Sequence, residues 1–91
     1  MTPRALGDAS VAFARRELAR GSDVRDVFAW LAGNGRSARA AARAVCLALG
    51  VEQAEAERRL AAAGLRDEGA VEADMIEDLA DLLAASGLFA R

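Results

Sequence analysis

The stretch SARAAARAVCLALG, residues 37–50, decides the fold of this chain. Ser37 is a good helix N-cap and a glycine closes the stretch, so we expect one helix over residues 37–49. Its arginines form a single narrow polar stripe, and every residue from Ala44 to Leu49 is apolar. Because a helix that is apolar nearly all round is usually buried, we expect this helix to lie at the centre of the domain.

Further short helices are expected on either side of this stretch, because glycines separate the remaining apolar patterns. The first is expected to begin at Asp8 as its N-cap, since Gly7 argues against one continuous helix from residue 3. Ser22 or Asp23 is expected to cap the second helix. The last two helices are expected to cover about residues 52–63 and 70–86.

The helix over residues 70–86 carries an apolar face that its spacing turns towards the core. The residues expected on this inner face are Val71, Met75, Leu79, Leu82, Leu83 and Ser86. Gly87 is a good C-cap, and Leu88 is placed to fold back in a Schellman-type contact. Ile76 falls on the polar side and Phe89 lies beyond the cap, so these two apolar residues suggest a second buried surface.

Together these patterns predict an all-α fold, a small globular bundle of four to five short helices in one domain over residues 1–91. The two helices at its centre are expected to form a helix-turn-helix-like hairpin over residues 37–63. Few residues are β-branched and no segment alternates between apolar and polar positions, so we expect no strand. Short, glycine-separated helices favour steep crossings over a long parallel bundle.

The composition removes most of the side chains that titrate or attack near neutral pH. The chain has no histidine and no tyrosine, a single cysteine, and only arginine among its 12 basic residues. Cys46 lies in the most apolar helix, where a free cysteine usually acts as a small buried hydrophobe. No phosphate loop, zinc spacing or catalytic triad is present. We therefore predict no catalytic residue, no metal ligand and no cofactor.

The composition also favours self-association, a location in the cytoplasm and a bacterial source. Apolar residues make up 54% of the chain, but only 4% are aromatic, so an alanine-rich core buries little area per residue. Small cores of this kind often gain stability from a second copy. One cysteine allows no internal disulfide, and no hydrophobic stretch follows Met1. Arginine without lysine, together with abundant alanine, indicates a GC-rich bacterial genome.

Charge is divided unevenly along the chain. Residues 1–66 carry 11 arginines and 7 acids, a net charge of +4, whereas residues 67–91 carry 7 acids and one arginine, a net charge of −6. The acidic end is either a solvated face or a surface that meets basic groups in this fold, in a second subunit or on a partner. The spacing of Asp74, Asp78 and Asp81, with Glu77 near them, also suits a hard cation, although such carboxylates are more often surface charge.

Aromatic and arginine residues supply the candidates for partner binding. Trp30 and Phe28 are the aromatic residues that suit an interface, although a corner of the core is an equally simple place for them. The arginines spaced along the central helix suit a phosphate or carboxylate, or pairing with the acidic last helix. The predicted partner-binding residues are Phe28, Trp30, Arg36, Arg39, Arg43, Ile76 and Phe89.

The segment from Ala42 to Leu60 reads helix, Leu49-Gly50-Val51, helix, and resembles a helix-turn-helix hairpin. The same spacing resembles the C-terminal hairpin of the ribosomal stalk protein family and small helical domains of the ubiquitin-associated type. The strands of the stalk domain have no counterpart in this chain. The helix-turn-helix resemblance implies that the second helix would enter the major groove of DNA, with Arg58 and Arg59 as its contacts.

Three functions follow from these patterns, in order of preference. The first is a small helical module that binds a protein or peptide and acts as a homodimer. The second is a helix-turn-helix DNA-binding regulator, against which Glu52, Glu55 and Glu57 argue because they would face phosphates. The third is a cofactor-free accessory enzyme that uses arginine and carboxylate groups on a peptide substrate. We expect no membrane segment, because charged residues interrupt every apolar run.

Overall fold

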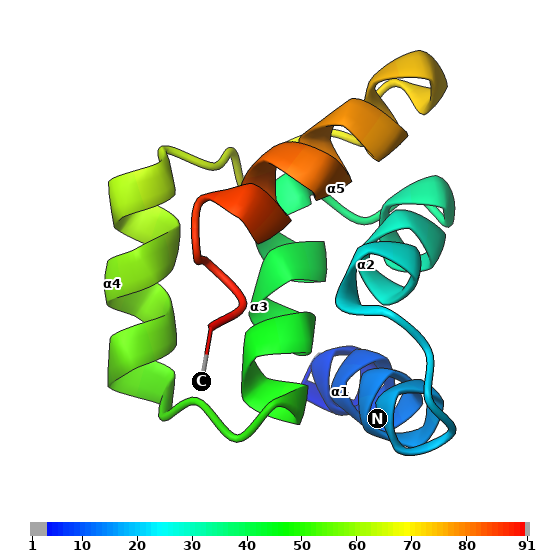
Figure 1. Ribbon diagram of the computed structural model, residues 1–91, viewed down its shortest axis with the longest axis vertical. Helices are drawn as coiled ribbons and strands as arrows, with labels where there is room; N and C mark the ends of the chain where they lie inside the picture. Colours follow the sequence, from blue (N-terminus) through cyan, green and yellow to red (C-terminus); the bar gives the residue numbers. More distant parts are fainter. Residues whose placement is uncertain (1–3, 91) are drawn as a thin grey trace.

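The helix over residues 38–48 lies at the middle of the domain, as the sequence predicts (Figure 1). The computed structural model describes the backbone of residues 4–90 and the side chains of residues 9–90. Within this range the chain forms five α-helices, a 3₁₀ turn and no strand, so the all-α prediction is confirmed. The elements are α1 (Arg4–Ala19), α2 (Val24–Gly33), α3 (Ala38–Ala48), α4 (Gln53–Ala63), η1 (Ala73–Met75) and α5 (Ile76–Ala85).

Helix α3 forms the centre because most of its side chains are small, and all of its residues are buried or half-buried. Ser37 caps the helix as predicted, and its Oγ accepts a hydrogen bond from the backbone N–H of Ala40 at 3.1 Å. Helices α1, α2 and α4 all pack directly against α3, while α5 packs on α2. Four residues of α3 have no exposed surface at all: Ala41, Ala42, Val45 and Cys46.

In helices α2 and α4 most of the buried residues are ones that the apolar spacing of the sequence predicts. The N-cap of α2 is Asp23, whose carboxylate accepts from the backbone N–H of Arg25 at 2.8 Å. The side of α2 that faces the core carries Val27, Phe28, Leu31 and Ala32. Helix α4 buries Ala56 and Leu60 and ends at Gly64, which adopts a left-handed conformation with φ of +68°. Glycine takes this conformation without steric strain, so the helix ends there.

Helix α1 differs from the prediction at its start. It begins at Arg4 and continues through Gly7, so Asp8 lies inside the helix and is not its N-cap. A glycine inside a helix costs only about 1 kcal/mol relative to alanine. Each residue that extends the helix adds one backbone hydrogen bond, so the cost of Gly7 is small enough for α1 to continue through it.

The last helix also begins later than the predicted residue 70. Glu72 is extended, with φ of −63° and ψ of 138°, and a 3₁₀ turn precedes the first residue of α5, Ile76. Val71, which lies before this turn, is half-buried and packs against the core. Packing of Val71 therefore outweighs the helical propensity of the residues around it.

The predicted inner face of this helix is confirmed in part. Leu83 is buried, and Val71 and Leu79 are half-buried and pack against the core, but Met75, Leu82 and Ser86 are exposed. The core instead takes Ala80, which is buried, and Ile76, which is half-buried. Met75 and Leu82, which we expected inside, are 52% and 64% exposed. Ile76 lies where α2 has no side chain, since a Cβ at Gly33 would lie 4.0 Å from Ile76 Cδ1.

The C-terminal segment folds back over α3 and α4 beyond the end of α5 (Figure 1). Its turn is the predicted Schellman motif: the N–H of Leu88 bonds to the carbonyl of Leu83, and the N–H of Gly87 bonds to that of Ala84, each at 3.3 Å. Leu88 and Phe89 are both buried in the core. The second apolar surface that Phe89 suggested is therefore part of the same core.

The folded chain measures 33 × 27 × 26 Å along its principal axes, so the short helices pack into a nearly isotropic body. None of the helices in the described range combines the length and the apolar character that crossing a membrane requires.

The burial of leucine side chains gives a direct test of this arrangement. Leu60 is fully buried, whereas Leu82 is mostly exposed. We expect Leu60→Ala to lower the free energy of unfolding by about 2–5 kcal/mol, because it leaves a cavity in the core. The same change at Leu82 should stay within about 0.5 kcal/mol. Urea unfolding followed by circular dichroism measures both values, and equal losses would contradict the packing of α4 and α5 described here.

Candidate functional site

The predicted partner-binding residues do not form one surface. Phe28 and Phe89 lie in the core, where their ring centroids are 6.3 Å apart and join α2 to the C-terminal segment. Ile76 is half-buried and packs against the core from α5. In this fold these three side chains stabilise the contact of α2 with the end of the chain, and they offer little surface to a partner.

The arginines of α3 are bound to a carboxylate of the neighbouring helix. Nη2 of Arg39 donates to Oε1 of Glu57 at 2.9 Å, and Nε of Arg43 donates to Oε2 of the same residue at 2.7 Å. The hydrogen bond to Glu57 raises the pKa of Arg43, while those from Arg43 and then Arg39 lower the pKa of Glu57. This cluster of Arg39, Arg43 and Glu57 ties α3 to α4, so the predicted pairing with the acidic last helix is replaced by pairing with α4.

Arg36 has a similar structural role at the other side of α3. Its Nε donates to Oγ of Ser10 at 2.6 Å, which connects the segment before α3 to α1. The three arginines that the sequence offered for a phosphate or carboxylate ligand therefore each contact a group of the fold itself.

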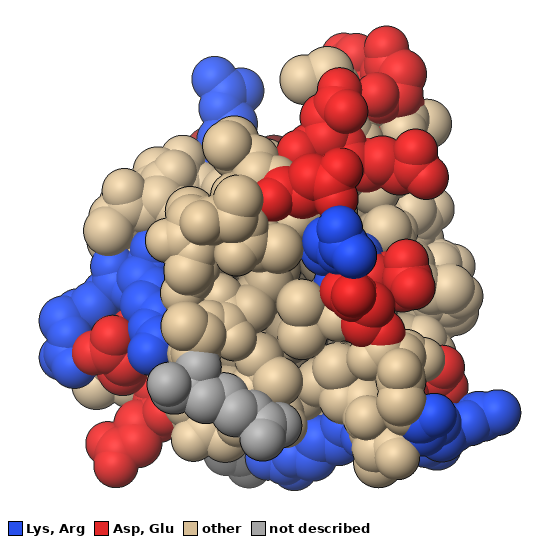
Figure 2. All heavy atoms as spheres, viewed as in Figure 1, with Lys and Arg blue, Asp and Glu red and all other residues tan. Residues whose placement is uncertain are grey.

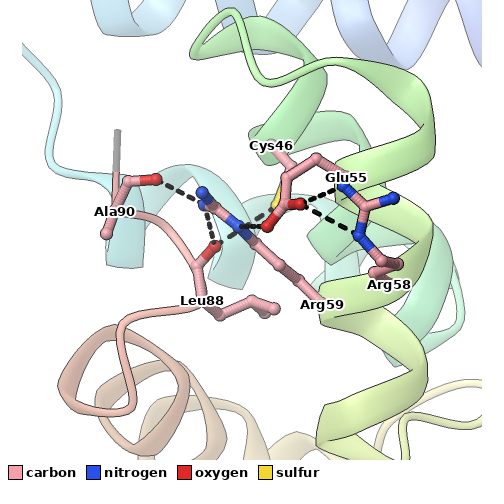
Figure 3. Close-up of polar contacts among 6 residues, drawn as sticks. All are labelled: Cys46, Glu55, Arg58, Arg59, Leu88 and Ala90. Atoms are coloured by element: carbon pink, nitrogen blue, oxygen red, sulfur yellow. Dashed lines mark hydrogen bonds and ion pairs between the residues drawn. The ribbon is translucent and has the colours of Figure 1, made fainter.

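The two arginines of α4 that would contact DNA both pair with Glu55 (Figure 3). The hydrogen bonds from Arg58 and then Arg59 lower the pKa of Glu55. Arg59 also donates to the carbonyl oxygen of Leu88 at 3.1 Å and to that of Ala90, whereas Arg58 reaches outwards with 70% of its side chain exposed. Arg59 thus holds the C-terminal segment against α4.

Cys46 lies beneath the segment that Arg59 holds (Figure 3). Its thiol is fully buried and donates to the carbonyl oxygen of Leu88, with Sγ 3.6 Å from that oxygen. Burial raises the pKa of this thiol, and the charge of Arg59 only partly opposes the effect. Because the thiolate is the reactive form, this environment suits a structural cysteine and not a nucleophile.

Trp30 is the one predicted aromatic candidate that remains at the surface, with 49% of the residue exposed. It stacks on Phe13 of α1 with ring centroids 4.0 Å apart and an interplanar angle of 24°. The sequence pattern singled out Trp30 but not Phe13, because helical spacing carries no information about which helices become neighbours.

The large exposed apolar side chains of η1 and α5, Met75 and Leu82, were missed as surface residues. Together with Leu79, which is half-buried and also packs against the core, they follow the spacing i, i+4, i+7 and lie along one side of this segment. We call these three residues the α5 strip. The misfit of Ile76 was the signal: a stripe of Ile76, Ala80 and Leu83 has the same spacing and is the one that the core buries.

A groove adjoins the α5 strip. It has a volume of about 470 Å³ and lies between the chain that leads from α4 to η1, the start of α3 and Leu79. Its apolar walls come from Ala38, Leu65, Val71 and Leu79, and its charged lining from Arg66, Glu68 and Glu72. Leu79 belongs to both features, so the groove meets the α5 strip at this residue.

Carboxylates surround this apolar surface. Figure 2 shows them gathered over η1 and α5 and again near the start of α2, with a single basic group between them. Arg25 of α2 contacts Asp81 at 3.3 Å and Asp23 at 3.1 Å. Over residues 67–90 the chain carries seven acids and no arginine. Among the described residues no group of three potential ligands is close enough to hold a metal ion, so Asp74, Asp78 and Asp81 do not form a metal site.

Comparisons of this chain with models of known protein families, with curated proteins and with solved structures find no match.

The position of Cys46 beneath the C-terminal segment leads to a prediction about its reactivity. A thiol reagent can reach Cys46 only when this segment opens, so we expect Arg59→Gln to accelerate labelling by about tenfold through the loss of charged hydrogen bonds. Arg58→Gln is the matched control, since Arg58 shares the partner Glu55 but does not contact Leu88 or Ala90. Stopped-flow labelling with a disulfide reagent gives the rates, and equal rates in the two variants would contradict the role of Arg59.

The cluster of Arg39, Arg43 and Glu57 predicts a pH-dependent contribution to stability. The pKa of Glu57 lies below its ordinary value of 4.5 in the folded state, so its contribution is complete above that value and disappears as the pH falls through the folded-state pKa. We expect Glu57→Gln to be less stable than the wild type near pH 7 and the difference to shrink below about pH 4.5.

Chemical unfolding across this pH range tests the point. The carboxylate of Glu52, which makes no side-chain cap hydrogen bond at the start of α4, supplies the control variant Glu52→Gln. A difference between wild type and Glu57→Gln that stays constant with pH would show that the carboxylate charge does not act through these two arginines.

Proposed function

We propose that this chain is a small helical module that binds a protein or peptide partner through the α5 strip and the adjoining groove. The observation that carries the proposal is the exposure of Met75, at the end of η1, and of Leu82 on α5, whose other side is buried in the core. Single exposed apolar residues are common, but a contiguous apolar surface bordered by polar groups is typical of an interaction site. Burying one such leucine against a partner contributes about 1.5–3 kcal/mol.

The electrostatics of the chain favour this proposal over DNA binding. Arg58 and Arg59 are both paired with Glu55, and Arg59 is further occupied by carbonyl groups of the C-terminal segment. In Figure 1, α3 and α4 run side by side in opposite directions, whereas the helices of a DNA-binding helix-turn-helix cross steeply. The acidic end of the chain would in addition repel the phosphate backbone.

The accessory-enzyme alternative draws less support from the geometry. It needs an arginine or a carboxylate that is directed at a substrate. Arg36, Arg39 and Arg43 each contact another residue of the fold, and Glu57 accepts from two of them. These groups already have the partners that would otherwise be substrate atoms.

Self-association remains part of the proposal and would use a different surface. A twofold contact through α5 would bring two acidic surfaces together, which is unfavourable. The stacked pair of Phe13 and Trp30 lies on α1 and α2, and it is the exposed aromatic surface that would suit a second copy.

Site-specific cross-linking tests the proposed binding surface. We expect a photo-reactive amino acid at position 82 to give a discrete adduct with another protein in lysate of the source cells. The same residue at position 61, an exposed alanine of α4, should give none. Unlabelled wild-type chain should compete for the adduct, while unlabelled Leu82→Ser should compete at least tenfold less well. Equal adducts at both positions, or equal competition by both chains, would count against α5 as the binding surface.

A further inference from the structure

The α5 strip has the dimensions of a docking site for one helix. Seven residues separate Met75 from Leu82, which corresponds to about 10 Å, or two turns, along α5. A partner helix with apolar residues at i, i+3 or i+4 and i+7 presents contacts at the same spacing. The groove beside Leu79 is large enough, at about 470 Å³, to accept one bulky apolar side chain of that helix.

Carboxylates border the strip on both sides. Asp78 follows Met75 by three residues and precedes Leu82 by four, so it lies next to both residues on the helix surface. Asp81 lies on the same side of the α5 strip as Asp78. On the groove side, Glu68 and Glu72 line the hollow next to Leu79. Arg66 in the groove lining and Arg25 beside Asp81 are the basic groups that face this region, so the negative charge dominates.

We infer that the segment that docks on the α5 strip is a basic amphipathic helix, with apolar residues on one side and lysine or arginine along both flanks. This inference rests on the proposed function and adds the chemistry of the partner. Apolar contact with Met75, Leu79 and Leu82 supplies the affinity, while the flanking carboxylates select a positive partner and set its orientation.

A second copy of this chain fits the site less well. Two α5 strips in contact would place Asp78 and Asp81 of each copy near those of the other. The helices with a net positive charge are α1 and α3. Helix α1 turns Ala14 to its own core and packs Leu18 against that core, so its apolar side is not available to another copy. Helix α3 is central, and both of its arginines bond to Glu57. A positively charged amphipathic helix from a different protein can contact the apolar residues of the α5 strip and pair with the carboxylates beside it.

Three synthetic peptides test the inference with the full chain. Each has 13 residues, which is the combined length of η1 with three residues and α5 with ten. The first places leucine at helical spacing with lysine on the flanks, the second replaces every lysine by glutamate, and the third has the composition of the first in scrambled order. Fluorescence anisotropy measures the dissociation constant of each peptide at about 50 mM and 200 mM sodium chloride.

We expect the first peptide to bind at least tenfold more tightly than the other two. Leu82→Ser should weaken its binding about tenfold, because the change removes an apolar contact at an exposed position that the fold does not need. Asp78→Asn should weaken binding severalfold at the lower salt concentration and less at the higher one. Glu52→Gln, which changes an exposed acid just before α4, is the matched control and should leave binding unchanged. Circular dichroism of each variant establishes that it is folded.

Several results would overturn the inference. Equal binding of the lysine and glutamate peptides would show that charge does not select the partner. Equal binding of the first and the scrambled peptide would show that the helical spacing of the leucines is not required. An unchanged affinity in Leu82→Ser would place binding elsewhere. If position 82 cross-links to a protein while the basic peptide fails to bind, the proposed function stands and the inferred partner chemistry falls.

Discussion

Close packing of small side chains around α3 is the constraint on which the rest of the structure depends. Ala41, Ala42, Val45 and Cys46 have no exposed surface, and three helices contact α3 directly. Alanine allows helix axes to approach closely but contributes little apolar area from each residue. The fold compensates with polar ties between helices, such as the bonds of Glu57 to two arginines of α3 and those of Arg59 to the C-terminal segment.

These ties explain how a chain with a net charge of −2 acquires a strongly acidic surface. Arginines of the first two-thirds of the chain take part in contacts within the fold, so much of their positive charge is balanced locally. The carboxylates around α5 have few basic neighbours, with Arg25 and Arg66 as the exceptions. Met75 of η1 and Leu82 of α5 are exposed beside these carboxylates, so apolar and acidic groups occur together on the surface that we propose for a partner.

Much of the fold could be predicted from local patterns. Caps at Asp23 and Ser37, the ends near Gly64 and Gly87, and the central place of α3 all follow from side chains and backbone preferences of neighbouring residues. The candidate site could not be predicted as well. Two alternative stripes on α5 have equivalent helical spacing, and only contact with α2 near Gly33 decides that Ile76 turns inwards and Leu82 outwards.

The sequence by itself therefore determined the helical class, most helix boundaries and the surplus of carboxylates near the end of the chain, because these depend on residues close together along the chain. Only the tertiary structure decided which arginines are paired and which apolar residues remain exposed. Pairing of Arg43 with Glu57, or of Arg59 with the carbonyl of Leu88, joins residues far apart in sequence. Such contacts depend on how whole helices are placed in space, and no local spacing specifies that placement.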